Sequence, residues 1–272
     1  MLLEVIIPAL AGGCVVGMAL GLTGGGGTLL ALPWLIHVLG LPVRQAAVAS
    51  LAAVGAMAAL GAATRIRRGE AYLGLGLFFA VGGVMGAPLG VMSHRWLPEA
   101  LITAGFALVM LIVALRMWPD HVRPLAANST SLPPELHLGR CTLSEDGRLR
   151  LSSRCIPVLL GLGLATGILS GIFGVGGGFL IVPALMWLSR CDLRHAVATS
   201  LVAGAVITLA GVGGAVLGGE PFPLVITAWF ALGGMGGLLL SGLVSQRLAP
   251  AILGRGFSLA LIALAVFVLL RR

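Results

Sequence analysis

Long apolar runs separated by short polar stretches cover most of the chain. A helix of about 20 apolar residues crosses the hydrocarbon core of a bilayer, and runs close to this length recur in both halves. The expected segments are 5–22, 28–40, 45–63, 71–93, 98–118, 156–173, 178–189, 195–217, 221–245 and 249–270. This pattern predicts an all-α integral membrane protein.

A hydrophilic stretch divides these segments into two groups of five. It contains Pro124, Pro133 and Pro134, charges of both signs and polar runs, which are typical of a linker outside the membrane. The predicted parts are a first transmembrane repeat at 1–118, a hydrophilic linker at 119–154 and a second transmembrane repeat at 155–272.

The two groups repeat one another. A shift of 150 positions aligns 21–90 with 171–240 without a gap. Apolar helices resemble one another by chance, but Gly, Pro, Arg, Ser and Glu at matched positions do not, so the match indicates a duplication. The matched pairs include Gly24 with Gly174, Pro33 with Pro183, Arg44 with Arg194, Ser50 with Ser200, Glu70 with Glu220, Met85 with Met235 and Gly86 with Gly236.

The number of segments and the charges predict that the repeats are inverted. An odd number of segments per half reverses the direction of the second half. The loop at 65–70 carries three arginines, whereas its counterpart at 215–220 keeps only an acidic residue. The positive-inside rule then places the first loop and the linker 119–154 in the cytoplasm, and the N-terminus outside.

Two glycine clusters interrupt the apolar pattern, at 21–28 and at 171–178. Each glycine inside a helix costs about 1 kcal/mol relative to alanine, so we expect the helix to break there. Unwound backbone at membrane depth must be buried in protein or line a watery cavity. The short apolar segments that follow, 29–39 and 179–188, would reach roughly half of a bilayer as helices.

A half-helix that begins at a glycine turn offers free N–H groups and the positive end of its dipole to an anion. Two such helices that meet near the midplane are typical of inverted-repeat transporters. The alternative is that the glycines only allow close helix packing. The candidate substrate-binding residues are Gly24, Gly25, Gly26, Gly27 and Thr28, with Gly174, Gly176, Gly177 and Gly178 in the second half.

A second shared signature follows each predicted half-helix, at 44–51 and 194–201. Ser50, Thr199 and Ser200 lie two turns inside the next helix, where their hydroxyls would face the cavity or bond back to their own helix. Arg44 and Arg194 lie near the interface, where an arginine can snorkel.

Composition and charge narrow the class of partner. Only 10% of residues are charged, against about 25% in a soluble domain. The net charge of +8 comes from arginines in short loops, so we expect lipid and not nucleic acid as the partner. No acidic residue falls in the middle of a predicted span, so the sequence shows no buried carboxylate relay for protons. The lack of buried acids also suits a small anionic substrate, which such acids would repel.

The sequence carries no sign of an enzyme. The four cysteines are scattered, without metal-ligand spacing. The first glycine cluster lacks the preceding strand and the Lys-Ser/Thr ending of a nucleotide loop. We therefore expect no catalytic residues, no metal and no cofactor.

The two glycine motifs, with Ala-Thr-Ser-Leu at 198–201, resemble the TauE/SafE sulfite exporter family over about 5–118 and 156–270. The resemblance implies a multi-pass protein of the bacterial inner membrane that exports sulfite, organosulfonates or related anions. It also implies that the glycine hairpins, Ser50, Thr199 and Ser200 form the substrate site. The first repeat departs from the pattern, because Ala49 stands where the second has Thr199.

The expected function is therefore a secondary transporter that works by alternating access. A passive anion channel is the main alternative. A membrane enzyme and a scaffold whose linker docks a partner are further alternatives.

Overall fold

The structure, a computed structural model, describes residues 2–94, 105, 108, 111, 142–143, 149–150, 155–173, 180–182, 184–185, 193–217 and 223–245. Its helices are α1 (Leu2–Thr23), α2 (Gly26–His37), α3 (Val43–Arg67), α4 (Leu73–His94), α6 (Cys155–Phe173), α8 (Leu193–Leu217) and α9 (Leu224–Ser245). Two short strands, β1 (Thr142–Leu143) and β2 (Leu149–Arg150), pair antiparallel within the predicted linker.

The predicted class, an all-α membrane protein, is confirmed. Within the described residues, five helices are long and apolar enough to cross a bilayer, and α6 contributes a shorter apolar stretch. The spans are Val5–Thr23, Gln45–Arg67, Leu73–Gly90, Arg194–Val216 and Leu224–Gly242. The expected segments at 98–118, 178–189 and 249–270 lie largely or wholly outside the described residues.

A tight turn reverses the chain after α1. α1 ends at Thr23, Gly24 adopts a left-handed φ of 74°, and α2 begins at Gly26. α2 then runs back along α1, since the indole Nε1 of Trp34 donates to the carbonyl of Pro8 at 3.1 Å. With 12 residues, α2 spans about 18 Å, which is roughly half of a bilayer.

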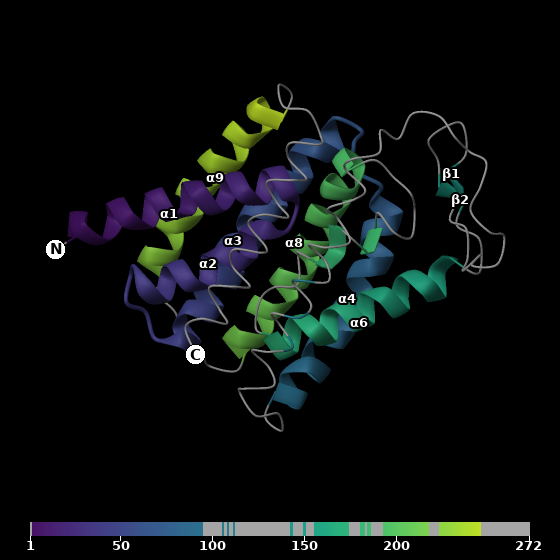
Figure 1. The fold of residues 1–272 in the computed structure, drawn as a ribbon, viewed down its shortest axis with the longest axis horizontal. Coiled ribbons are helices and arrows are strands. Elements are labelled where there is room, and N and C mark those ends of the chain that lie inside the picture. Colours follow the sequence, from purple (N-terminus) through teal and green to yellow (C-terminus); the bar gives the residue numbers. More distant parts are fainter. Residues whose placement is uncertain are drawn as a thin grey trace.

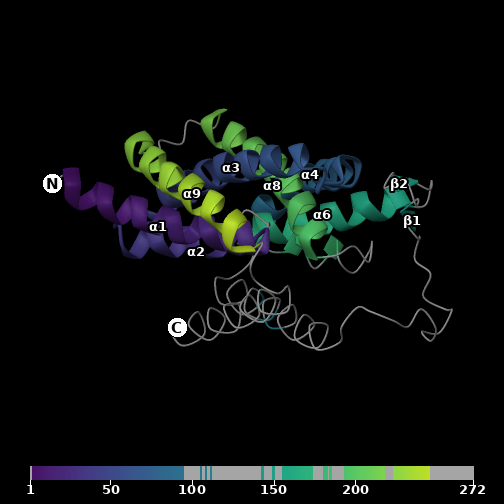
Figure 2. The same ribbon diagram turned by 90° about the horizontal axis from the view of Figure 1, so that it is seen from above.

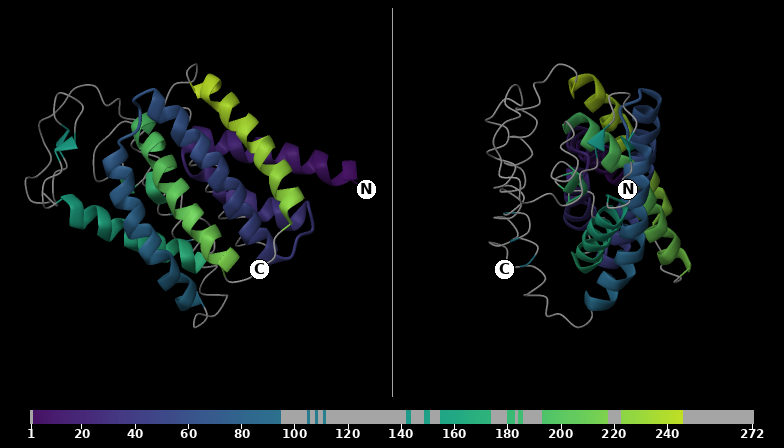
Figure 3. Two further views of the ribbon diagram at one scale, coloured as in Figure 1. Left: turned by 180° about the vertical axis from the view of Figure 1, so that it is seen from behind. Right: turned by 90° about the vertical axis from the view of Figure 1, so that its right-hand side faces the viewer.

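α3 and α8 lie side by side in the middle of the molecule (Figures 1 and 3), flanked by α1 and α9 on one side and by α4 and α6 on the other. The two central helices run in opposite directions. Gly55 lies against Thr208, whereas Gly61, further along α3, lies against Leu201, earlier in α8.

The flanking pairs α1–α9 and α4–α6 pack through glycines, which we call the glycine seams. In one seam Gly17 lies against the carbonyl of Gly234, and in the other Gly167 lies against the carbonyl of Gly83. A side chain at Gly17 or at Gly167 would meet backbone. Small residues therefore let the paired helices approach closely, as is common in membranes.

The seams also show how the halves correspond. Gly237 faces the carbonyl of Cys14, and Gly86 faces the carbonyl of Leu164. α6 therefore matches α1 at a shift of 150, but α9 matches α4 at a shift of 151. The ungapped alignment of 21–90 with 171–240 is wrong at its end: the structural partner of Gly86 is Gly237 and not Gly236.

Buried apolar side chains form two clusters. The first joins α1, α2, α3 and α9 with part of α8, and includes Leu35, Met57 and Phe230. The second joins α4, α6 and α8 with residues 181, 182, 184 and 185, and includes Phe79 and Leu185. Each cluster thus contains helices of both sequence halves. Figure 2 shows α1, α2 and α9 towards one end of the helical array and α4 and α6 towards the other.

Candidate functional site

The Gly24 turn of the first half lies directly against α8 of the second half. A β-carbon at Gly24 would lie 2.5 Å from Ser200 Oγ and 2.9 Å from Val182 Cγ2. Because this residue also has a positive φ, glycine alone fits here. The hydroxyl of Ser200 donates to the Gly24 carbonyl at 3.0 Å or to the Val197 carbonyl of its own helix at 2.8 Å.

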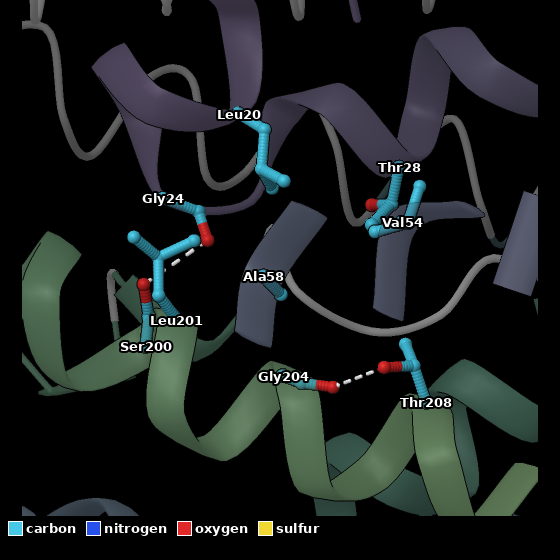
Figure 4. Close-up of a pocket in the computed structure, with 9 residues that line it drawn as sticks. All are labelled: Leu20, Gly24, Thr28, Val54, Ala58, Ser200, Leu201, Gly204 and Thr208. Atoms are coloured by element: carbon cyan, nitrogen blue, oxygen red, sulfur yellow. Dashed lines mark hydrogen bonds between the residues drawn. The ribbon is translucent and has the colours of Figure 1, made fainter. Parts of the chain in front are cut away.

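A small pocket lies beside this contact (Figure 4). α1, α2 and the turn between them form one side, α3 a second side and α8 a third. Its volume is about 10 Å³, room for about one water molecule. A sulfur oxyanion does not fit in this conformation. The pocket is lined by Leu20, Gly24, Thr28, Val54, Ala58, Ser200, Leu201, Gly204 and Thr208.

The polar groups of the pocket already have partners within the protein. Thr28 Oγ1 donates to the Gly25 carbonyl at 2.8 Å, and Thr208 Oγ1 donates to the Gly204 carbonyl at 2.7 Å. These bonds satisfy buried hydroxyls that would otherwise destabilise the fold. An anion would have to draw the hydroxyl hydrogens away from these carbonyls.

The N-terminus of α2 faces the same region. Gly25 is its N-cap, without a capping side chain, and the Thr28 N–H donates to the Gly25 carbonyl at 3.2 Å. Gly26 and Gly27 occupy the first helical positions, whose N–H groups have no acceptor within a helix. Gly27 lies against Val16 and Leu20 of α1, which keeps the hairpin closed.

Two predicted hydroxyls lie away from this pocket. Ser50 Oγ donates to the Ala47 carbonyl of its own helix at 2.9 Å. Thr199 is fully buried, and its Oγ1 accepts the Tyr72 N–H at 3.2 Å, which ties α8 to the start of α4. Gly174, Gly176, Gly177 and Gly178 lie outside the described residues.

Several pocket residues were not predicted from the sequence. Gly204 and Thr208 follow Ser200 at intervals of four, so one face of α8 carries all three. That spacing was a usable signal. Val54 and Ala58 show the same interval on α3, but they are indistinguishable from ordinary apolar helix residues.

Charged and aromatic groups gather near the end of α3 and the start of α8. Arg65 Nη2 donates to the Gly21 carbonyl at 2.8 Å, and its Nη1 lies 3.4 Å from Glu70 Oε2. The ring of His195 stacks on Tyr72 with centroids 5.3 Å apart. The side chain of Arg44 lies outside the described part of the structure. Among the described residues, no three His, Cys, Asp or Glu side chains gather as a metal site would need.

The sequence profile described as sulfite exporter TauE/SafE matches residues 9–268. The chain belongs to the TauE/SafE sulfite exporter family. The matched range includes the Gly24 turn, both glycine seams and the pocket residues of α8.

Relatives of the chain carry the general name of a membrane transporter. A probable membrane transporter protein of Xylella fastidiosa (strain Temecula1) is 31% identical over all of this chain and 97% of the relative. Another from strain 9a5c is 32% identical with the same coverage. YdhB of Bacillus subtilis is 28% identical over 74% of each chain. No solved structure matches the chain significantly. The protein is thus a multi-pass membrane transporter of the TauE/SafE family.

Proposed function

We propose that the protein is a secondary transporter that exports small sulfur-containing anions, such as sulfite or an organosulfonate, by alternating access. The observation that carries this proposal is the contact between the Gly24 turn and Ser200. It joins a glycine turn of one half to a hydroxyl of the other half at the start of a short helix.

The chemistry of this contact suits an anion. The first N–H groups of α2 and its dipole favour negative charge, and the surrounding low-dielectric interior strengthens that preference. Every residue lining the pocket is uncharged, so none of them repels an oxyanion. The family description, sulfite exporter, gives the substrate class its support.

The helix directions support inverted repeats and alternating access. α3 and α8 occupy equivalent places in the two halves and run in opposite directions. The α1–α9 seam corresponds to the α6–α4 seam when the halves are exchanged. Such an arrangement has two equivalent poses, one open to each side of the membrane.

The small pocket fits a closed conformation of such a carrier. Its buried apolar lining residues all belong to the first cluster, with α1, α2 and α3 on one side and α8 on the other. Room for an anion requires α8 to move away from α1, α2 and α3, and the Ser200–Gly24 bond would break in that step. The hydroxyl of Ser200 would then be available to the substrate.

Flux of sulfite from proteoliposomes tests the proposal. Gly24→Ala places a methyl group against Ser200 and Val182, and overpacking of this kind costs about 1–3 kcal/mol. We expect sulfite flux to fall by about tenfold or more. Gly40→Ala is the matched control, because Gly40 also has a positive φ of 67° but no atom within 4 Å of the added carbon; its flux should stay close to that of the wild type.

Two results would contradict the proposal. One is the absence of flux of sulfite or a sulfonate under any imposed gradient. The other is flux far above carrier turnover with single-channel steps in a planar bilayer, which would identify a passive anion channel.

A further inference from the structure

A second and larger cavity lies beside the glycine turn. It has a volume of about 140 Å³ and lies between the ends of α1 and α3, the start of α8 and the last turns of α9. We call this cavity the arginine vestibule, after its lining residues Arg65, Arg68 and Arg194. Glu70, Thr64 and Ser241 also line it.

The three arginines differ in their bonding. Arg65 is 13% exposed and is held by the Gly21 carbonyl and by Glu70. Arg68 and Arg194 are exposed, and neither forms an ion pair within the described part of the chain. Three guanidinium groups against one carboxylate leave two net positive charges in the cavity, since arginine stays protonated in proteins.

The hydroxyls of the vestibule do not supply its binding groups. Thr64 Oγ1 donates to the Gly61 carbonyl at 2.9 Å, and Ser241 Oγ donates to the Leu238 carbonyl at 2.6 Å. The guanidinium groups of Arg68 and Arg194 are therefore the donors that remain for a ligand. A planar guanidinium binds the oxygens of sulfite, sulfonate or phosphate through paired hydrogen bonds.

The vestibule adjoins the small pocket. Leu201 is buried and lines both cavities, and Gly21 of the vestibule lies one turn before Gly24 of the pocket. The side chain of Leu201 thus lies at the boundary between the vestibule and the pocket beside the glycine turn. The predicted topology puts this end of the bundle in the cytoplasm, where an exported anion would be collected.

We propose that the arginine vestibule is an oxyanion-binding site, which holds the substrate through Arg68 and Arg194 before the substrate reaches the glycine turn. This inference rests on the proposed export function. The phosphate of an anionic lipid has the same binding chemistry, so the test separates the two ligands.

The test compares Arg68→Gln/Arg194→Gln with Arg67→Gln. Arg67 is also exposed and lies next to Arg68, but it does not line the vestibule. Sulfite efflux is measured in phosphatidylcholine vesicles, which lack anionic lipid. Binding of radiolabelled sulfite is measured on the detergent-solubilised protein carrying Gly24→Ala, which overpacks the small pocket, so that binding at the vestibule is read by itself.

The double variant should weaken sulfite binding and raise KM by about tenfold, the loss expected for two charge-assisted contacts. The kcat should stay within about twofold, and binding by Arg67→Gln should be unchanged. Moderate salt should weaken binding by the wild type more than by the double variant, because exposed charges are screened.

The outcomes decide the inference separately from the export function. Sulfite affinity and KM that are unchanged in the double variant overturn it. If the double variant, purified in detergent, binds less phosphatidylglycerol than the wild type but has an unchanged affinity for sulfite, the inference is overturned in favour of a lipid site. Arginine-dependent sulfite binding without any flux by the wild type supports the vestibule and removes the proposed function.

Discussion

Gly24 and Ser200 are 176 positions apart in the sequence and in contact in the structure. The contact depends on the left-handed turn at Gly24, because only that turn brings the carbonyl to the Ser200 hydroxyl without a side chain between them. A single residue of each half therefore determines how the halves meet at the pocket.

Ser200→Ala tests this contact at the scale of one hydroxyl. The substitution leaves the buried Gly24 carbonyl without its side-chain donor, which costs about 1–3 kcal/mol. We expect a melting temperature in detergent that is lower by about 3 °C or more, together with a marked fall in sulfite flux. Ser50→Ala is the control, since its hydroxyl bonds only to its own helix; both measurements should stay near wild type. Equal losses from the two variants would show that the contact has no special role.

The sequence was informative about residues where the chemistry is local. Glycines that break a helix and hydroxyls that follow them can be identified from the chain alone, and Gly24, Thr28 and Ser200 were predicted in this way. Whether a hydroxyl faces a cavity or its own helix depends on how that helix is rotated. For this reason Ser50 and Ser200 looked equivalent in the sequence but bond differently in the structure.

In the glycine seams, helices pack through backbone contact in place of side-chain contact. Gly237 in α9 lies against the carbonyl of Cys14 in α1, whereas the adjacent Gly236 has no atom within 4 Å of an added carbon. Two neighbouring glycines of one helix therefore have opposite roles.

The pair Gly237→Leu and Gly236→Leu separates these roles. Leucine at 237 forces α1 and α9 apart and should lower the melting temperature in detergent by about 5 °C or more. Leucine at 236 should leave the melting temperature within about 2 °C of wild type. Similar shifts for both variants would contradict the assignment of the seam.

Helix boundaries were well predicted because composition decides where a chain enters a bilayer. The predicted start of the segment after the first glycine cluster, residue 28, lies two positions from the start of α2 at Gly26. The pairing of α1 with α9 was not predicted, since apolar helices offer no distinguishing pattern. The shift of one extra residue between the halves was missed for the same reason, and the β1–β2 pair lies in a segment read only as a linker.

At the scale of the whole molecule, the contacts place two loops at opposite ends of the bundle. The Trp34–Pro8 bond puts the end of α2 near the start of α1. The Arg65–Gly21 bond puts the end of α3 near the end of α1. The predicted topology then assigns the first end to the outside and the second to the cytoplasm.

Cysteine labelling tests this assignment. Val38→Cys and Arg67→Cys introduce thiols at exposed sites near the two ends. They are made in a chain whose own cysteines are replaced, namely Cys14, Cys141, Cys155 and Cys191. A membrane-impermeant maleimide added to intact cells should label Val38→Cys, and Arg67→Cys only after lysis. The reverse order would invert the predicted topology, and labelling of both from one side would exclude it.

Each of the two buried clusters needs helices from both sequence halves to be complete. α9 of the second half is built into the first cluster, and α4 of the first half is built into the second. A polypeptide made from either half alone would lack one of the helices that form its buried cluster. We therefore expect a gene divided within 119–154 to yield a working carrier only when both fragments are made in the same cell, each completing the other.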